Sequence, residues 1–151
     1  GAGTGSVTVE MALQAPDGMV YAIERNAEAC GLIEQNKRKF CTPNIRVVKG
    51  LAPEAMEDLP APTHAFIGGS AGNLKEILEC LLGKNPKIRL VINTVTLETV
   101  GEVMQCLKEL PLIEEEILSV NTARSRKLGA YHLMTGQNPI YIITCRGGEE
   151  A

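Results

Sequence analysis

The chain has 151 residues and a formal net charge of −3, a length that fits one domain with a buried core. Hydrophobic residues make up 44% and charged residues 22%, an ordinary balance for a globular protein. No apolar run approaches the length that spans a bilayer, and the acidic balance disfavours nucleic-acid binding. We therefore expect a single domain over residues 1–151, located in the cytoplasm, with neither a membrane nor a nucleic acid as partner.

The residues that most often bind metals or form disulfides are few and scattered. The five cysteines lie far apart with no C-x-x-C pair, and the chain has only two histidines, His64 and His132. This pattern favours cysteines that are small buried hydrophobes in a reducing compartment. We expect no metal site, because no local spacing adds carboxylate ligands to the histidines.

Short apolar runs alternate with helical patterns along the chain. The first helix is expected to begin at Thr4 or Ser6 and to end at the turn that starts with Ala15. Strands are predicted at residues 19–24, 45–50, 64–69 and 88–93, all apolar on both faces as in a covered parallel sheet. The intervening helices are predicted from Asn26 towards residue 40, as a short helix begun by Pro53, over residues 74–83 and over residues 100–107.

The order of these elements predicts a Rossmann-like α/β fold, with a mostly parallel twisted sheet and helices on both faces. The end of the chain differs, because residues 114–123 and 139–145 read as two strands with no helix between them. They predict an antiparallel pair at one edge, and therefore an antiparallel C-terminal strand. The series lacks its first strand before Gly1, so we expect the chain to be an N-terminally truncated part of a longer polypeptide.

A glycine-rich loop opens the chain, with Gly1, Gly3 and Gly5 in the pattern G-x-G-x-G. The dinucleotide pattern G-x-G-x-x-G/A needs a small residue in sixth place, where this chain has Ser6. The observed spacing is the form seen in S-adenosylmethionine-dependent methyltransferases. Glu24 ends the next strand, where a carboxylate can accept both hydroxyls of a ribose. A flexible terminus for the loop and a solvated acid for Glu24 are the alternatives.

Two further strand ends add residues to the same edge of the predicted sheet. Gly50, Leu51 and Ala52 lie at the end of one strand and could lie along an adenine ring, and Gly68, Gly69 and Ser70 lie where the next strand ends. Open α/β sheets bind ligands at the carboxyl ends of their strands. The sequence has no N/D-P-P-Y/F motif there, which disfavours methylation of exocyclic amines and leaves room for a bulky, flat substrate.

In order and spacing, five segments resemble the decarboxylating precorrin-6Y/6B methyltransferases of cobalamin biosynthesis. These are "GAGTGSVTVEMA", "VYAIERN", "GLAPEAM", "AFIGGSAGNLKEIL" and "LVINTVTLET". The resemblance implies a class I fold and methyl transfer from S-adenosylmethionine to a meso carbon of precorrin-6B or cobalt-precorrin-6B, with loss of carbon dioxide from an acetate side chain. It further implies a homo-oligomer, in particular a tetramer, and a sister methylating domain that is separate or fused.

Carried over residue by residue, the resemblance predicts a set of cofactor-binding residues, to which we add their neighbours: Gly1, Ala2, Gly3, Thr4, Gly5, Glu24, Arg25, Gly50, Leu51, Ala52 and Gly68. One departure is His64, where an aspartate is expected. For the substrate, which has many carboxylates, we predict contacts with Gly69, Ser70, Asn93, Thr96, Arg124, Arg126 and Lys127. The three basic residues are expected in a loop directly after a strand, and no catalytic acid or base is identified.

Two other functions remain open at this point. The chain could methylate another small molecule or RNA, or it could be a non-catalytic assembly fragment. The absence of a Ser/His/Asp or Cys/His set does not argue against an enzyme, because displacement at a sulfonium needs no side-chain nucleophile.

Overall fold

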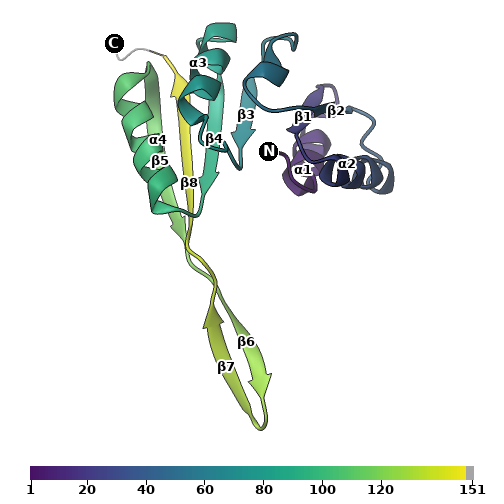
Figure 1. Ribbon diagram of the computed structural model, residues 1–151, viewed down its shortest axis with the longest axis vertical. Helices are drawn as coiled ribbons and strands as arrows, with labels where there is room; N and C mark the ends of the chain where they lie inside the picture. Colours follow the sequence, from purple (N-terminus) through teal and green to yellow (C-terminus); the bar gives the residue numbers. More distant parts are fainter. Residues whose placement is uncertain (149–151) are drawn as a thin grey trace.

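The computed structural model describes residues 1–148 and has the predicted α/β order (Figure 1). Its first part alternates α1 (Ser6–Gln14), β1 (Val20–Glu24), α2 (Ala27–Lys39), β2 (Ile45–Lys49), the short 3-10 helix η1 (Glu54–Met56), β3 (His64–Ile67), α3 (Leu74–Lys84), β4 (Arg89–Thr94) and α4 (Leu97–Glu109). Four strands follow: β5 (Leu112–Val120), β6 (Ala123–Leu128), β7 (Tyr131–Gly136) and β8 (Ile140–Gly147).

The strands pair as the sequence predicts for the body of the fold. β1 pairs with β2 and β3 with β4, both in parallel. The C-terminal strand β8 lies between β4 and β5 and is antiparallel to each, in the order β3-β4-β8-β5. The predicted antiparallel C-terminal strand is therefore confirmed, and β5 runs parallel to β4 at the edge of the sheet. A bulge interrupts β5 between Ile113 and Glu116.

β1 and β3 belong to different sheets and are not paired with each other within residues 1–148. The start of the glycine loop lies between their carboxyl ends. The amide of Ala2 donates to the Ile23 carbonyl at 2.9 Å, and the nitrogen of Gly1 donates to the Gly69 carbonyl at 3.3 Å. A strand preceding Gly1 stays a prediction.

Helices cover the two sides of this arrangement. Val9 and Ala12 of α1 and Ile33 of α2 bury one side of β1 and β2 around Ala22. The next residue, Ile23, packs on the larger cluster formed by α3, α4 and the four-stranded sheet. Because successive residues of a strand point to opposite faces, the two helix pairs lie on opposite sides. Helices on both faces were predicted, and this prediction is confirmed.

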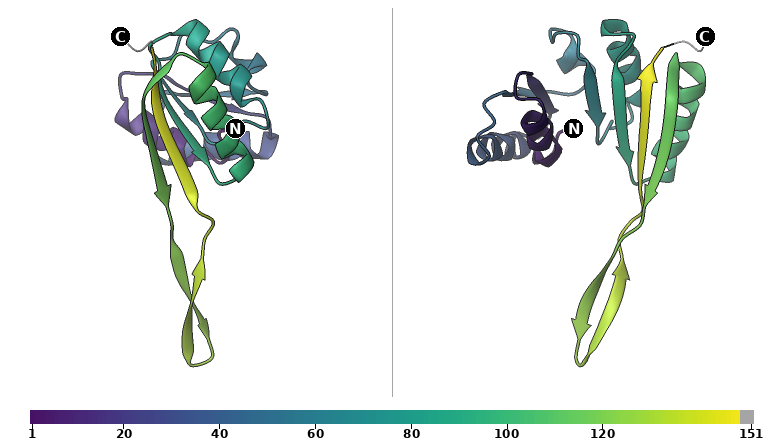
Figure 2. Two further views of the ribbon diagram at one scale, coloured as in Figure 1. Left: turned by 90° about the vertical axis from the view of Figure 1, so that its left-hand side faces the viewer. Right: turned by 180° about the vertical axis from the view of Figure 1, so that it is seen from behind.

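The segment between β5 and β8 differs from the prediction. The sequence was expected to form a strand over residues 114–123 and then a basic loop, but β5 ends at Val120 and a β6–β7 hairpin follows. The hairpin extends away from the rest of the molecule (Figures 1 and 2). Every residue of β6 and β7 is exposed. The expected alternation of buried and exposed residues is absent there, because neither face of the hairpin is covered.

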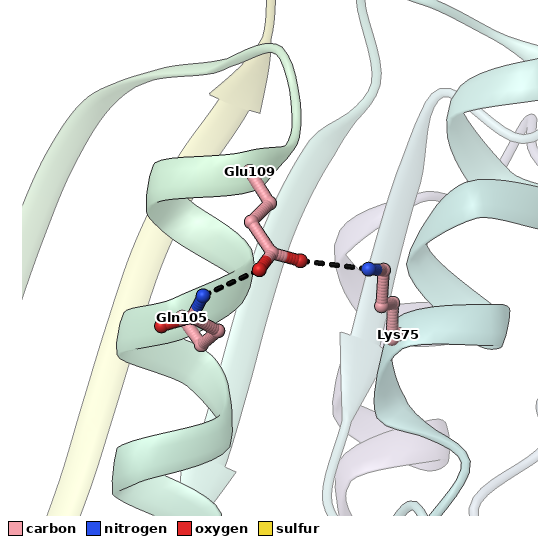
Figure 3. Close-up of polar contacts among 3 residues, drawn as sticks. All are labelled: Lys75, Gln105 and Glu109. Carbon is pink, nitrogen blue, oxygen red and sulfur yellow. Dashed lines mark hydrogen bonds and ion pairs between the residues drawn. The ribbon is translucent and has the colours of Figure 1, made fainter.

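Two polar contacts connect elements that are distant in the sequence. Nδ2 of Asn44 lies within hydrogen-bond distance of the carbonyl oxygens of Ala12, Ala15 and Gly18, at 3.0, 2.9 and 3.1 Å. It therefore fixes the end of α1 against the start of β2. On the surface, Nζ of Lys75 in α3 lies 2.7 Å from Oε2 of Glu109 in α4, and Gln105 donates to the same carboxylate (Figure 3).

Candidate functional site

A cavity of about 340 Å³ lies at the carboxyl ends of β1, β2 and β3. Its lining residues come from four segments that are far apart in the sequence: Gly1, Glu24, Arg25, Gly50, Leu51, Ala52, Gly69, Ser70, Ala71 and Ile77. The volume lies within the range of ligand pockets for small molecules. The coincidence of strand ends predicted from the sequence is therefore found as one cavity.

Glu24 is the charged group that the glycine loop encloses. Its Oε2 accepts a hydrogen bond from the Gly3 amide at 2.9 Å, and its Oε1 accepts one from the Asn26 amide at 2.9 Å. Only 8% of the Glu24 surface is exposed. An ionised carboxylate has about four lone-pair sites, so each oxygen retains capacity for a donor from a ligand.

The environment of Glu24 keeps its side chain ionised. Burial acts to raise the pKa of the Glu24 carboxyl, but the hydrogen bonds from Asn26 and Gly3 outweigh it and the pKa is lowered overall. Glu24 therefore offers a negatively charged acceptor throughout the neutral range.

The rest of the glycine loop is held by close packing against α2. Gly5 precedes α1 with φ +82°, and a Cβ added there would lie 2.9 Å from Cγ1 of Ile33. Only glycine meets both conditions without strain. The Thr4 carbonyl accepts a hydrogen bond from Nδ2 of Asn36 at 2.9 Å. Ala2, Gly3, Thr4 and Gly5 thus shape the loop and hold Glu24, while Gly1 lines the cavity itself.

The opposite wall comes from the loops after β2 and β3. Gly50 is required by close approach, since an added Cβ would lie 2.7 Å from the Cβ of Ala55. Leu51 and Ala52 contribute apolar surface, and Ser70 contributes a hydroxyl. This combination of an apolar wall and a buried carboxylate suits a ligand with a flat apolar ring and vicinal hydroxyls.

Several of the predicted residues do not line the cavity. Gly68 lies against the ring of Phe66, where an added Cβ would be 2.9 Å from Cε1. Asn93 is the last residue but one of β4 and Thr96 caps α4, and both lie outside the lining set. Arg124, Arg126 and Lys127 were predicted in a loop at a strand end. They instead lie on β6 in the projecting hairpin, because β5 ends before them and the chain turns back at residues 129–130.

Some residues at the cavity were not predicted from the sequence. Ile77 lines the cavity but fits the apolar repeat of α3, which indicates only a core position. Ala71 follows the predicted Ser70 directly and has φ +52°. Asn26 was predicted only as a helix cap, a role confirmed by the bond from the Ala29 amide to its Oδ1. Its backbone amide additionally binds Glu24, which a carboxylate two residues before a cap could have suggested.

The cysteines and the spacing of possible metal ligands limit the chemistry available to this part of the molecule. All five cysteines are free, and burial raises the pKa of the Cys145 thiol to about 11, so this thiol is not a nucleophile at neutral pH. Within residues 1–148 no three His, Cys, Asp or Glu side chains gather closely enough to hold a metal ion. In the same part of the chain, no helix has the length and apolarity needed to cross a membrane.

Together, the sheet order, the glycine loop and the acid at the end of β1 define a class I methyltransferase fold, and solved methyltransferase structures share it. The chain belongs to the precorrin methyltransferase family, whose domain matches residues 1–146.

Relatives of known name agree with this assignment. A protein of Methanothermobacter thermautotrophicus named "Probable cobalt-precorrin-6B C(15)-methyltransferase (decarboxylating)" is 39% identical over 145 residues, covering 95% of this chain and 74% of its own. The Salmonella typhimurium cobalt-precorrin-6B C(15)-methyltransferase (decarboxylating) is 33% identical over 150 residues, covering 99% and 77%. The crystal structure of precorrin-6y C5,15-methyltransferase from Geobacter metallireducens superposes with a TM-score of 0.86 at 37% identity, over 97% of this chain and 77% of that one.

Proposed function

We propose that the chain methylates a meso carbon of precorrin-6B or cobalt-precorrin-6B, using S-adenosylmethionine, with loss of carbon dioxide from an acetate side chain. The observation that carries this proposal is the cavity in which the glycine loop, Glu24 and the loops after β2 and β3 meet, in a chain of the precorrin methyltransferase family.

The residues at the cavity fit S-adenosylmethionine. Glu24 is held by Gly3 and Asn26 so that its remaining lone pairs can accept the two ribose hydroxyls. Leu51 and Ala52 provide an apolar wall for the adenine ring. The nitrogen of Gly1 lies 3.3 Å from the Gly69 carbonyl oxygen, so the two glycines bring backbone polar groups to the cavity, which suit the amino-acid part of the cofactor.

When bound, the cofactor supplies an electrophilic methyl group on a sulfonium sulfur. The protein's contribution is to bind and orient, since an in-line displacement depends chiefly on the distance and alignment of donor and acceptor carbon. Glu24 would fix the nucleoside by its ribose, and the loops after β2 and β3 would enclose it from the other side. No side-chain nucleophile is needed, in keeping with the composition of the cavity.

For the substrate, the proposal places contacts beyond the cofactor, at Gly69, Ser70, Asn93 and Thr96. Asn93 is half-buried, and its Oδ1 is covered by the protein and has no hydrogen-bond partner within residues 1–148, so a substrate donor would reach it only after the atoms over it move. A buried acceptor without a partner is costly in the free protein, and a donor on a substrate would remove that cost. The basic residues of β6 lie in the hairpin that projects beyond the carboxyl end of β5 (Figure 1). Their positive charges suit the carboxylates of a tetrapyrrole.

We further propose that the chain forms a homo-oligomer through the β6–β7 hairpin, in particular a tetramer, with a sister methylating domain that is separate or fused. Leu128, Tyr131 and Leu133 share one face at the tip of the hairpin. Arg126 and Arg124 follow on the same face towards the body of the molecule, which places the proposed contact between copies at the tip and the proposed substrate contacts beside it. Tyr131 is 74% exposed. An isolated two-stranded hairpin is marginally stable in water, so a second copy of this face is the occupant we expect.

The free cysteines suit a cytoplasmic location.

The function is tested by incubating the intact protein with cobalt-precorrin-6B and S-adenosylmethionine that carries an isotopically labelled methyl group. The expected product has gained one labelled methyl group and lost carbon dioxide, as measured by mass spectrometry. Methylation of RNA under the same conditions, with an unchanged tetrapyrrole, would contradict the proposal.

A further inference from the structure

Asn73 contacts three residues of the cavity wall although it does not line the cavity itself. Its amide donates to the Ser70 carbonyl at 3.0 Å, and its carbonyl accepts from the Ile77 amide at 3.0 Å. Its side-chain Nδ2 donates to the Ala52 carbonyl at 3.4 Å. Ser70, Ile77 and Ala52 all line the cavity. One residue therefore connects the loop after β3, the first turn of α3 and the loop after β2.

The side chain of Asn73 is not used where its position in the chain would place it. Asparagine immediately before a helix is favoured because its side-chain oxygen accepts a hydrogen bond from the first turn. Asn26 and Thr96 make this bond before α2 and α4. Asn73 precedes α3 but makes no side-chain cap. Its carboxamide instead reaches across to Ala52.

The bond to Ala52 crosses between two sheets. The loop of Ala52 follows β2 in the two-stranded sheet, whereas Asn73 follows β3 in the four-stranded sheet. Ala71 and Gly72, the two residues before Asn73, both have positive φ, and Ala71 lines the cavity. The side chain of Asn73 thus sets the separation of two walls that no sheet hydrogen bond joins directly within residues 1–148.

We propose that Asn73 is a positioning residue for the cofactor, which holds the Leu51–Ala52 wall at the correct distance from the loop of Ser70. This inference rests on the proposed function, since it assumes that the cavity binds the nucleoside of S-adenosylmethionine. Asn73 would affect the ligand through the position of this wall, without contacting the ligand itself. Loss of the Asn73–Ala52 bond should weaken binding of any ligand that contains the adenosine group.

The test uses Asn73→Ser and Asn73→Asp in the intact protein. Both replacements are good helix caps, but serine is too short to reach Ala52 and an ionised aspartate has no donor. A purely structural role predicts a lower midpoint of thermal unfolding, as for any lost hydrogen bond, and an unchanged ligand affinity. Positioning predicts a Kd for S-adenosylhomocysteine raised about threefold to tenfold by calorimetry, whatever the change in midpoint. The Kd for adenosine alone should rise by the same factor.

Asn85→Ser is the matched control, because Asn85 lies at the other end of α3 and its Nδ2 donates to the Pro62 carbonyl at 2.8 Å. It should lower stability and leave the Kd unchanged. Equal Kd values for the Asn73 variants and the unaltered protein would overturn the inference and leave the proposed function standing. A Kd raised equally by Asn85→Ser would overturn it too, because affinity would then follow general stability. Failure of the unaltered protein to bind S-adenosylhomocysteine would overturn both proposals.

Discussion

The amide of Gly3 donates a hydrogen bond to Oε2 of Glu24 at 2.9 Å. This bond joins the two features that the sequence presents 21 residues apart, the glycine loop and the acid at the end of the next strand. The loop and the carboxylate therefore form one unit, in which a change in either alters the other.

Replacing Glu24 by Gln should weaken cofactor binding. Gln keeps the shape of the side chain but removes the charge and turns an NH₂ group towards one of the two amides that now donate to it. Hydrogen bonds to a charged group contribute about 1.5–3 kcal/mol, so the Kd for S-adenosylhomocysteine should rise about tenfold to a hundredfold. Calorimetry measures this change, with the exposed Glu28→Gln as control. A Kd equal to that of the unaltered protein would contradict the role of Glu24.

The stability that the ionised Glu24 contributes should depend on pH in one direction. Its pKa is lowered from the ordinary value of 4.5, so the folded state favours the ionised form more than the unfolded chain does. The contribution is therefore fully present above pH 4.5 and is lost as the pH falls through the folded pKa. Comparing urea unfolding of the unaltered protein and Glu24→Gln from pH 7 to pH 3 should give a difference that is constant at first and then shrinks. A difference that grows as the pH falls would show the opposite sign.

Asn44→Ala should destabilise the fold without altering the cavity. The side chain lies within hydrogen-bond distance of three carbonyl oxygens at the end of α1 and in the turn that follows. Leaving such groups without a donor costs about 1–3 kcal/mol, measured as the free energy of unfolding in urea. Asn121→Ala is the control, since the exposed Nδ2 of Asn121 donates at 3.3 Å to the hydroxyl of Ser119, only two residues away. Similar losses for both variants would contradict the bridging role of Asn44.

Asn93→Leu should separate stability from activity. The buried Oδ1 of Asn93 has no partner within residues 1–148, so an apolar side chain of similar size should leave the free energy of unfolding unchanged or raise it. If the amide binds the tetrapyrrole, kcat/KM should fall about tenfold, while the Kd for S-adenosylhomocysteine stays the same. Full activity in this variant would remove Asn93 from the substrate contacts.

Positive charges placed among the apolar residues at the tip of the β6–β7 hairpin should dissociate the oligomer. Tyr131→Lys with Leu133→Lys adds two cations beside Arg126, where burial between copies is proposed, so both desolvation and like-charge repulsion oppose association. Light scattering after size exclusion should then report a lower mass. His132→Lys, on the opposite face of β7, is the control and should keep the mass of the unaltered protein. A double variant that retains that mass would refute the hairpin interface.

The order of the elements and most of the cavity could be predicted because local signals there agree with the tertiary structure. Glu24 follows a strand that is apolar on both faces, and Gly50 and Gly69 follow two more, so the strand ends alone bring them together. The residue at position 5 has a positive φ and packs closely against Ile33. Only glycine meets both conditions, so this structural requirement is visible in the sequence.

The hairpin and the inner support of the cavity were not predictable in the same way. Residues 124–127 of β6 are all polar, and every residue of this strand is exposed, so β6 lacks the alternation that burial imposes on a strand. The one local signal is the two-residue turn at Gly129, with φ +61°, which is a hairpin pattern. The role of Asn73 depends on where the loop of Ala52 lies in space, and no pattern around Asn73 contains that information.

The bulge in β5 has a consequence for how the molecule avoids polymerisation. β5 is the outer strand of the four-stranded sheet, and such a strand can accept a strand from another molecule along its free backbone groups. Three successive glutamates, Glu114, Glu115 and Glu116, occupy this edge, and Glu114 has φ +57°. A β5 strand of another molecule added at this edge would place glutamates beside glutamates and would meet the interrupted hydrogen-bond ladder at the bulge. Open-ended growth of fibrils from this edge is therefore disfavoured.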